Sequence, residues 1–471
     1  MIVRAMSALS TTSARWPRDP RVQQSLRHSV RDGIAHSVMT GAGETYFAAY
    51  ALFLGASDAF LSLLAALPPL VGAGAQLGAA WLARRTDRRR RFVFASAVLQ
   101  ALTWLPILWL PYAFPAYAVP MLLGCLALYY AAVGFGTPLW SSLMAELVPA
   151  HVRGRFFGRR SQYMHLASFL GLVAAGLTLQ YFEARDNAQL AFALIFGTAA
   201  GARLCSAYHL ARMHEPERRP APMVAETETA PLVQSPLLRF SCFAAAVMAA
   251  VGISAPFFAL YMLKDLGMTY FEFALATAVY VGAQFISLRA WGRLADLYGN
   301  RTLLVVTGAA LPLLPLPWLL SPGLGPVLLL QATGGWFWAG FRLALRNYLY
   351  DLVPAGPRPR DWALHNFLGA LGTAAGALLG GTLAGKGGLT AFGVGLPWRG
   401  IAAALTASAV LRALVLLAFL PRIRETRPVR PFSARTFLVA MLRFNHLGVL
   451  VCRWSRRLAR RDGAGNDRLD A

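Results

Sequence analysis

The chain has 471 residues, of which 57% are hydrophobic and only 14% are charged, and its mean hydropathy is +0.49. A water-soluble chain of this length carries about 25% charged residues, so the composition excludes an ordinary soluble enzyme or binding domain. The formal net charge of +24 raises the question of a nucleic-acid partner. A chain this apolar leaves no folded soluble domain to present a basic surface, so we expect no nucleic-acid binding.

Apolar runs long enough to cross a bilayer recur along almost the whole chain. A hydrocarbon core about 30 Å thick requires roughly 20 apolar residues per helix. The first six expected spans cover residues 33–53, 60–82, 92–112, 117–145, 162–181 and 188–211. The second six cover residues 238–262, 270–290, 302–320, 326–350, 362–385 and 398–420. The sequence therefore predicts an all-α membrane protein with about twelve transmembrane helices.

A polar segment separates the two sets of spans. Residues 213–236 are rich in Glu, Arg and Pro, and they predict a linker between an N-terminal six-helix half, 32–212, and a C-terminal half, 237–421. Residues 1–31 form a basic N-terminal tail. Residues 422–471 form a basic C-terminal tail, which either lies on the membrane surface as an amphipathic helix or stays disordered.

The basic residues alternate from loop to loop. The arginine-rich loops are 84–91, 153–160, 293–301 and 358–360, and both tails are also rich in arginine. The loops near Gly55, Phe114 and Pro322 carry no Lys or Arg. This positive-inside pattern predicts that both termini face the cytoplasm, in an inner or plasma membrane. We also expect the arginines to contact anionic lipids of the cytoplasmic leaflet.

The loops after the fourth and tenth spans repeat one pattern. Residues 146–155 read Glu-Leu-Val-Pro-Ala-His-Val-Arg-Gly-Arg, and residues 351–360 read Asp-Leu-Val-Pro-Ala-Gly-Pro-Arg-Pro-Arg. An acid, the run Leu-Val-Pro-Ala and two arginines recur at identical spacing. This repeat predicts that the two halves are pseudo-symmetric copies of one bundle.

The loop after the eighth span resembles a known signature. Residues 292–301 read Gly-Arg-Leu-Ala-Asp-Leu-Tyr-Gly-Asn-Arg, which is similar to the G-x-x-x-D-x-x-G-x-R loop of the major facilitator superfamily, although Leu297 stands where a basic residue is usual. The copy after the second span is degenerate: Leu82 stands where the acid is expected, and Asp87 supplies one in a shifted register. The resemblance implies a twelve-helix secondary transporter that acts as a monomer.

The two signature loops and the acids that end the fourth and tenth spans predict a cytoplasmic latch. Gly292 is expected to let two helix ends approach closely, and Asp296 to accept hydrogen bonds from a helix N-terminus. We expect Arg301 to pair with Asp351, and the run 88–91 with the acid of the fourth span, in a latch that favours the outward-open state. The alternative is a set of solvated charges that only determine topology. The expected latch residues are Gly292, Asp296, Gly299, Arg301, Asp351, Asp87, Arg88, Glu146, Arg153, Arg155, Arg358 and Arg360.

Glu44 is the acid that the sequence places deepest in an expected span, near the middle of the first. An ionisable group at that depth is costly, so it marks a candidate proton carrier. Many proton-coupled members of the superfamily use an acid on the first helix, and the resemblance implies the same role here. The alternative is a structural carboxyl group bonded to a neighbouring helix.

Arg342 and Arg346 lie four residues apart in the tenth span and share one helix face. Arg342 is expected to contact an anionic substrate or to serve as the counter-ion of Glu44, and the alternative is a side chain that reaches out to the membrane surface. Because the fourth and tenth helices face the central cavity in the superfamily, further candidates are Tyr130, Trp140, Ser141, Gln331, Trp336 and Trp338. Ordinary packing is the alternative for each of them.

Several patterns limit the chemistry. His165 and His365 have no metal-ligand spacing around them, so no metal site is expected, and Gly372, Gly376 and Gly380 form a stripe typical of close helix packing. The chain has no P-loop, G-x-S-x-G or H-E-x-x-H motif, so neither an ATP-driven pump nor an enzyme is expected, and no cofactor. The sequence predicts a proton-coupled transporter of a small solute. An uncoupled facilitator and a non-transporting membrane sensor or assembly partner remain as alternatives.

Overall fold

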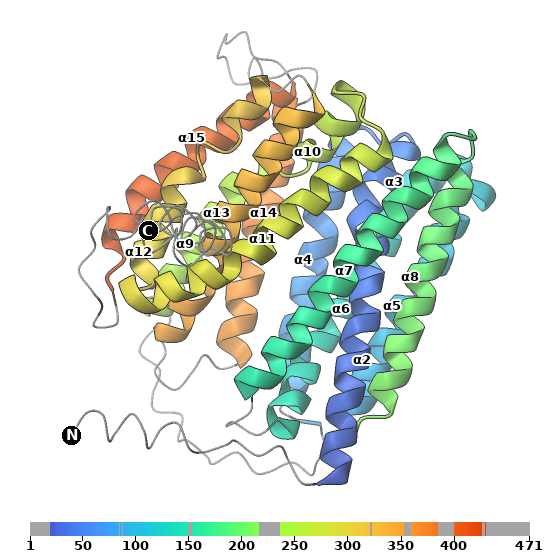
Figure 1. Cartoon of the computed structure of the whole chain (residues 1–471), viewed down its shortest axis with the longest axis vertical. Helices are drawn as coiled ribbons and strands as arrows, with labels where there is room; N and C mark the ends of the chain where they lie inside the picture. Colours follow the sequence, from blue (N-terminus) through green and yellow to red (C-terminus); the bar gives the residue numbers. More distant parts are fainter. Residues whose placement is uncertain are drawn as a thin grey trace, which may run out of the picture.

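The computed structural model describes residues 19–83, 85–86, 88–148, 153–215, 236–320, 323–352, 359–384, 400–425 and 429. Within these residues the regular structure is helical and no strand is present. Figure 1 shows the helices of the N-terminal half, coloured blue to green, beside those of the C-terminal half, coloured yellow to red.

The N-terminal half contains one long helix or helix pair for each of its six expected spans. Its elements are α2 (Pro20–Ala42), a 3₁₀ turn (Glu44–Tyr46), α3 (Phe47–Phe53), α4 (Asp58–Leu82), α5 (Arg89–Ala113), a 3₁₀ turn (Pro115–Tyr117), α6 (Ala118–Leu147), α7 (Arg153–Glu183) and α8 (Ala188–Ala211).

The C-terminal half repeats this order. Its elements are α9 (Pro236–Gly252), α10 (Phe257–Leu260), a π turn (Tyr261–Asp265), α11 (Tyr270–Tyr298), α12 (Asn300–Ala310), a 3₁₀ turn (Leu316–Leu320), α13 (Leu324–Asp351), α14 (Pro359–Ala384), α15 (Ile401–Phe419) and a 3₁₀ turn (Leu420–Arg422). Among the described residues, nine helices are long and apolar enough to cross a membrane. Each of the twelve predicted spans contains helix, although in the ninth, 302–320, α12 ends at Ala310 and only a 3₁₀ turn follows.

The first helix begins at Pro20, well before the predicted start at residue 33. Asp19 caps it, because its carboxylate accepts a hydrogen bond of 2.8 Å from the Arg21 N–H, and Pro20 suits the first helical position. This stretch is too polar to count as an apolar window, yet it buries one face, including Ser25 and Leu26. Part of the predicted N-terminal tail is therefore helix.

The first helix of each half is interrupted. In the N-terminal half, α2 ends at Gly43 and a 3₁₀ turn, Glu44–Tyr46, leads into α3. In the C-terminal half, α9 ends at Gly252 and the chain turns before α10. Short 3₁₀ and π segments inside a long helix often mark hinges or functional sites. The two breaks occupy equivalent places in the two halves.

The largest hydrophobic core shared by the two halves lies at one end, and a small second cluster, Ala66 with Ala374 and Ala377, also joins α4 to α14. The large joint core draws on both halves and includes Tyr50, Leu61, Leu179, Phe257, Phe273 and Trp318. Toward the other end each half has a core of its own. The N-terminal core includes Leu26, Val93, Leu143 and Leu210, and the C-terminal core includes Phe240, Trp291, Leu304 and Leu345.

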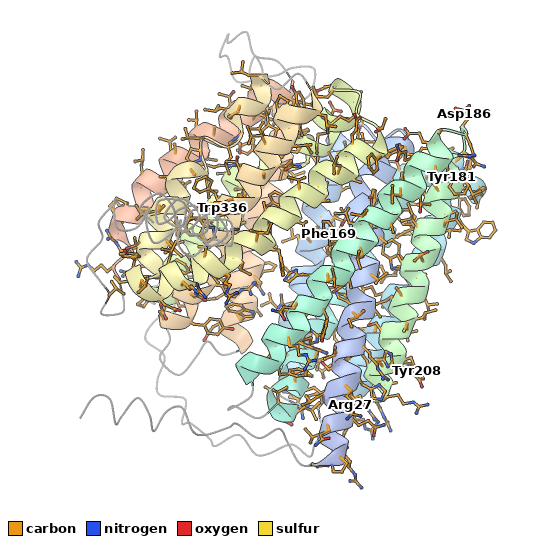
Figure 2. The ribbon with its side chains drawn as sticks, viewed as in Figure 1. Arg27, Phe169, Tyr181, Asp186, Tyr208 and Trp336 are labelled. Atoms are coloured by element: carbon orange, nitrogen blue, oxygen red, sulfur yellow. The ribbon has the colours of Figure 1, made fainter. Side chains whose placement is uncertain are left out.

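The two ends of the N-terminal half are easily followed in Figure 2. Tyr181 and Asp186 lie at the upper end, close in sequence to the joint core, whereas Arg27 and Tyr208 lie at the lower end. The start of α2 therefore lies at the end where the halves keep separate cores.

Two long helix pairs, α4 with α14 and α7 with α11, make most of the contact between the halves, and α10 also contacts α3 and α4. The Asn366 amide donates to Gln76 Oε1 over 3.3 Å, and Gly381 lies against the Ser62 side chain. In the other pair, Gly176 lies against Ala274. These small residues let the helices approach closely.

The predicted glycine stripe packs α14 against α9, which confirms the packing interpretation. A Cβ atom at Gly372, Gly376 or Gly380 would overlap the carbonyl oxygens of Ala245, Ala249 or Ile253, respectively. A backbone carbonyl cannot rotate away as a flexible side chain can. The stripe therefore fixes the distance between α9 and α14.

We expect Gly376→Ala to destabilise the protein by about 1–3 kcal/mol, because the added methyl group meets the Ala249 backbone. Gly369→Ala on the same helix is the matched control, since a Cβ there has no atom within 4 Å. The midpoint of thermal unfolding in detergent measures both. Equal midpoints for the two variants would contradict the packing argument.

Candidate functional site

Glu44 lies at the break in the first helix, with its carboxylate turned toward α6. Tyr129 donates its hydroxyl to Glu44 Oε2 over 3.2 Å, and Tyr130 donates to Oε1 over 3.3 Å. Glu44 and Tyr130 are half-buried, whereas Tyr129 is fully buried. The structure thus brings two predicted residues together and adds Tyr129, which the sequence interpretation missed.

An aromatic shell holds Tyr129 in place. The rings of Phe47 and Trp104 stack with their centroids 5.1 Å apart, and both meet the Tyr129 ring edge-on, at 5.4 Å and 5.3 Å. Such edge-on contacts are favourable for aromatic pairs. Gly43 lies directly against the Trp104 ring, so a side chain there would collide with it. The break in the first helix is therefore fixed by packing.

A second polar group is buried in the same half, nearer the start of α2. Arg160 of α7 pairs with Asp32 of α2, with 3.2 Å between Nη2 and Oδ2, and it also donates to the Ser29 carbonyl over 3.0 Å. The Ser206 hydroxyl donates to Asp32 over 2.6 Å. Arg203 of α8 donates in turn to the Ser206 oxygen over 2.6 Å. All three charged residues are at least nine-tenths buried.

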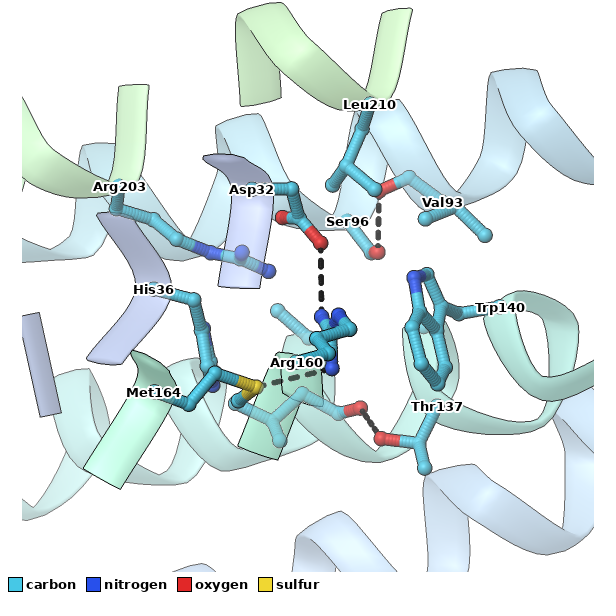
Figure 3. A pocket seen from close by; sticks show the side chains of 13 residues that line it. Asp32, His36, Val93, Ser96, Thr137, Trp140, Arg160, Met164, Arg203 and Leu210 are labelled. Atoms are coloured by element: carbon cyan, nitrogen blue, oxygen red, sulfur yellow. Dashed lines mark hydrogen bonds and ion pairs between the residues drawn. The ribbon is translucent and has the colours of Figure 1, made fainter. Parts of the chain in front are cut away.

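These groups line a cavity of about 210 Å³ enclosed by α2, α5, α6, α7 and α8. Figure 3 shows Asp32, Arg160 and Arg203 gathered on it, with Trp140 beside the Arg160 guanidinium. The Arg160 guanidinium carbon lies 4.7 Å from the centroid of the Trp140 ring. Trp140, predicted to line a central cavity, therefore lines a cavity inside the N-terminal half.

The sequence interpretation missed this group for two reasons. Asp32 lies one residue before the predicted first span, 33–53, so the apolar window does not include it. Arg160 was counted as a loop residue, although it lies inside α7. Arg203 is the residue from which the sequence could have revealed this buried charged group, because an arginine in the interior of a membrane span is costly and usually functional.

The other predicted cavity residues lie in the C-terminal half. Arg342 is exposed and lies over the Trp338 ring, 5.4 Å from its centroid. Among the described residues no ion pair joins Arg342 to Glu44, so the expected counter-ion pairing is absent, because two tyrosines already occupy the carboxylate. Trp338 is buried in the C-terminal core.

Three further candidates have ordinary surroundings. The Trp336 carbonyl accepts a hydrogen bond of 2.8 Å from Trp291 Nε1, and Figure 2 shows Trp336 within the C-terminal half. Gln331 is half-buried and Ser141 is exposed. In the described part of the chain, no group of three or more His, Cys, Asp or Glu side chains is placed to hold a metal ion.

One expected latch contact of the N-terminal half is present. Arg89 forms a two-pronged ion pair with Glu146, with nitrogen–oxygen distances of 2.7 Å and 2.8 Å. The run 88–91 thus pairs with the acid of the fourth span, as predicted, through Arg89. Arg88 instead donates its main-chain N–H to the Thr86 hydroxyl over 3.1 Å.

The C-terminal half differs from the prediction. Asp351 accepts a hydrogen bond of 2.6 Å from the Asn300 amide. Arg301 turns away, donating its main-chain N–H to Glu425 over 2.9 Å and its Nε to the Ile423 carbonyl over 2.7 Å. The predicted Arg301–Asp351 pair is therefore wrong in this structure, because the segment after α15 occupies Arg301.

Two other expectations for this loop are not met. A Cβ atom at Gly292 would have no atom within 4 Å, so close packing does not require glycine there. Asp296 is exposed and has no hydrogen bond to any described residue. Glycine is required instead at Gly299, where φ is +84° and the Glu425 carboxylate lies against Cα.

The remaining latch candidates cannot be placed. Asp87 and Arg358 lie outside the described residues, as do the side chains of Arg153, Arg155 and Arg360. The contacts that are described, Arg89–Glu146 and Asn300–Asp351, each stay within one half.

Comparison with protein families decides the class of the chain. The family model described as "Major Facilitator Superfamily" matches residues 34–251 and, a second time, residues 240–458. The chain belongs to this superfamily. It is therefore a multi-pass membrane transporter and not an enzyme. The two matches fall on the two helical halves, in line with their repeated order of helices. No curated protein matches the sequence.

Solved structures share the fold of this superfamily member at low sequence identity. A mutant of the nucleoside transporter NupG has a TM-score of 0.60 and 12% identity, covering 85% of this chain and 100% of that one. A D-xylose-proton symporter has a TM-score of 0.60 and 15% identity, covering 87% and 99%. A bacterial homolog of the human lysosomal transporter Spinster, in an inward-facing and unoccupied conformation, has a TM-score of 0.56 and 14% identity, covering 92% and 98%.

Proposed function

We propose that this protein is a proton-coupled secondary transporter of a small solute, with Glu44 as its proton carrier. One observation carries the proposal: the Glu44 carboxylate lies at a break in the first helix and contacts two tyrosine hydroxyls. The shared fold with a D-xylose-proton symporter supports coupling to protons in general terms.

The two tyrosines suit a group that gains and loses a proton. A hydroxyl donates to a carboxylate and accepts from a carboxylic acid, so Tyr129 and Tyr130 can bond Glu44 in either form. Neither form is then left without a partner in a low-dielectric site. Glu44 is only half-buried, so its carboxyl group is not sealed from exchange of a proton.

The distribution of the cores supports alternating access. The joint core seals the halves at one end, while the other end, where α2 begins, has two separate cores. With both termini in the cytoplasm, as the positive-inside pattern predicts, this is the inward-facing form. In this form the exposed Asp296 has no hydrogen bond to a described residue, whereas Arg89 and Glu146 are paired within the N-terminal half. The proposal also includes contact between the cytoplasmic arginines and anionic lipids, and a transporter that acts as a monomer.

The test measures internal pH in dye-loaded proteoliposomes challenged with pooled metabolites and drugs. Wild type should show a solute-dependent proton flux, and Glu44→Gln should lose at least 90% of it, because glutamine cannot carry a proton. Asp186→Asn is the matched control. It removes an exposed carboxylate at a position with φ +54°, which asparagine also tolerates.

The other outcomes assign other functions. Solute movement without proton flux in wild type would indicate an uncoupled facilitator, and Glu44 would lose its role as carrier. No movement of any solute, from protein shown to be folded, would favour a membrane sensor or assembly partner. Equal proton flux in Glu44→Gln and wild type would leave coupling in place but assign it to another group.

A further inference from the structure

The cavity inside the N-terminal half has a mixed lining. Its wall is partly apolar, at Val93, Ala132, Val133 and Leu210, and partly charged, at Arg160, Arg203 and Asp32. Thr137, another lining residue, is exposed, so the cavity is open at α6. Its volume of about 210 Å³ exceeds the share of a single water, about 30 Å³, several-fold. The cavity can therefore hold a small organic molecule.

The charges on the cavity wall do not balance. Two guanidinium groups, those of Arg160 and Arg203, face one carboxylate, that of Asp32. Asp32 is bonded directly to Arg160 and so neutralises it. Arg203 donates only to the Ser206 hydroxyl, and its buried Nε has no partner among the described residues. One buried positive charge is left without a direct counter-ion, which is unfavourable in a membrane protein interior.

Two further buried nitrogens on the cavity are without partners. His36 Nδ1 and Trp140 Nε1 are both inaccessible to solvent and form no hydrogen bond to any described residue. The indole nitrogen can only donate, and His36 can donate in one of its tautomers. With Arg203 Nε, three buried nitrogens of lining residues have no hydrogen-bond partner among the described residues.

From this combination we infer that the cavity is a binding site for a small organic monocarboxylate, with its carboxylate on Arg203 and its short apolar body against Val93 and Leu210. One negative charge restores balance, and a carboxylate can accept two hydrogen bonds from a guanidinium. The apolar part of the wall selects an organic acid over a hydrated inorganic anion. The site is distinct from Glu44, and binding there does not depend on proton coupling.

The test uses the purified full-length protein and isothermal titration with butyrate. Butyramide, its neutral counterpart of nearly the same shape, should bind at least tenfold more weakly. Arg203→Gln should weaken butyrate binding at least tenfold, whereas Arg203→Lys, which keeps the charge but loses the two-pronged contact, should bind more tightly than Arg203→Gln and more weakly than wild type. Arg185→Gln is the control, since Arg185 is an exposed arginine at the far end of the same half.

Three results would overturn the inference. Equal affinities for butyrate and butyramide would show that charge plays no part. Wild-type affinity in Arg203→Gln, or the same loss in Arg185→Gln, would place the anion elsewhere. Displacement of butyrate by equimolar chloride would indicate a site for inorganic anions. Size-exclusion profiles identical to wild type establish that each variant is folded, and Arg203→Lys guards against loss of structure alone.

Discussion

Oxidation of the double variant Ser62→Cys and Gly381→Cys is expected to stop transport almost completely. The two positions face each other across α4 and α14, and a Cβ at Gly381 would lie 2.9 Å from the Ser62 Cβ. A disulfide requires about 3.5–4.5 Å between Cβ atoms, so a shift of about 1 Å suffices. Leu61 and Leu383, their neighbours, belong to the joint core. The bond would therefore hold closed the end that alternating access must open.

The experiment starts from a variant in which the four native cysteines are replaced by serine. Transport in proteoliposomes is compared before oxidation, after oxidation, and after addition of a reductant, which should restore it. Each single cysteine variant serves as a control and should be insensitive to oxidation. Mass spectrometry of disulfide-linked peptides quantifies the bond. Wild-type transport by fully cross-linked protein would show that this end does not separate during the cycle.

The architecture could be predicted from the sequence because it depends on apolar length. A window of about 20 apolar residues can be recognised from its composition, whatever the order of its residues. Each of the twelve predicted spans therefore contains a helical segment of the structure. The start of α2 could not be predicted in this way, because residues 20–32 bury only one helix face and their composition is polar. The breaks at Gly43 and after Gly252 also escaped, since an interrupted helix keeps the same composition.

Residues of the candidate site could be predicted only where a single residue stands out from its surroundings in the sequence. Glu44 stands out as an acid in an apolar run, and the superfamily's use of the fourth helix led to Tyr130. Tyr129 was missed because nothing in the sequence distinguishes it from packing aromatics. The partner of Arg301 was missed because Glu425 lies 124 residues away, in a segment assigned to the tail. Pairings between distant polar residues depend on the packing of whole helices.

Asp32→Asn is expected to destabilise the protein more than Arg160→Gln, although the two side chains form one ion pair. The wild-type cavity wall carries two positive charges and one negative charge. Asp32→Asn leaves two buried guanidiniums without a carboxylate, and removing one partner of a buried pair costs about 3–5 kcal/mol. Arg160→Gln leaves Asp32 with Arg203, which reaches it through Ser206. We expect the loss in that variant to be about half as large.

Thermal unfolding midpoints of the purified single and double variants measure this difference. Asp32→Asn combined with Arg160→Gln restores the wild-type balance of one positive charge, so the double variant should be more stable than Asp32→Asn alone. Such a reversal requires a coupling energy of about 1–3 kcal/mol between the two positions. Additive losses, or a larger loss for Arg160→Gln, would contradict the charge count on the cavity wall. A reversal would show that the charges of Asp32 and Arg160 are coupled and that an unbalanced positive charge on this wall destabilises the half, whichever ligand the cavity holds.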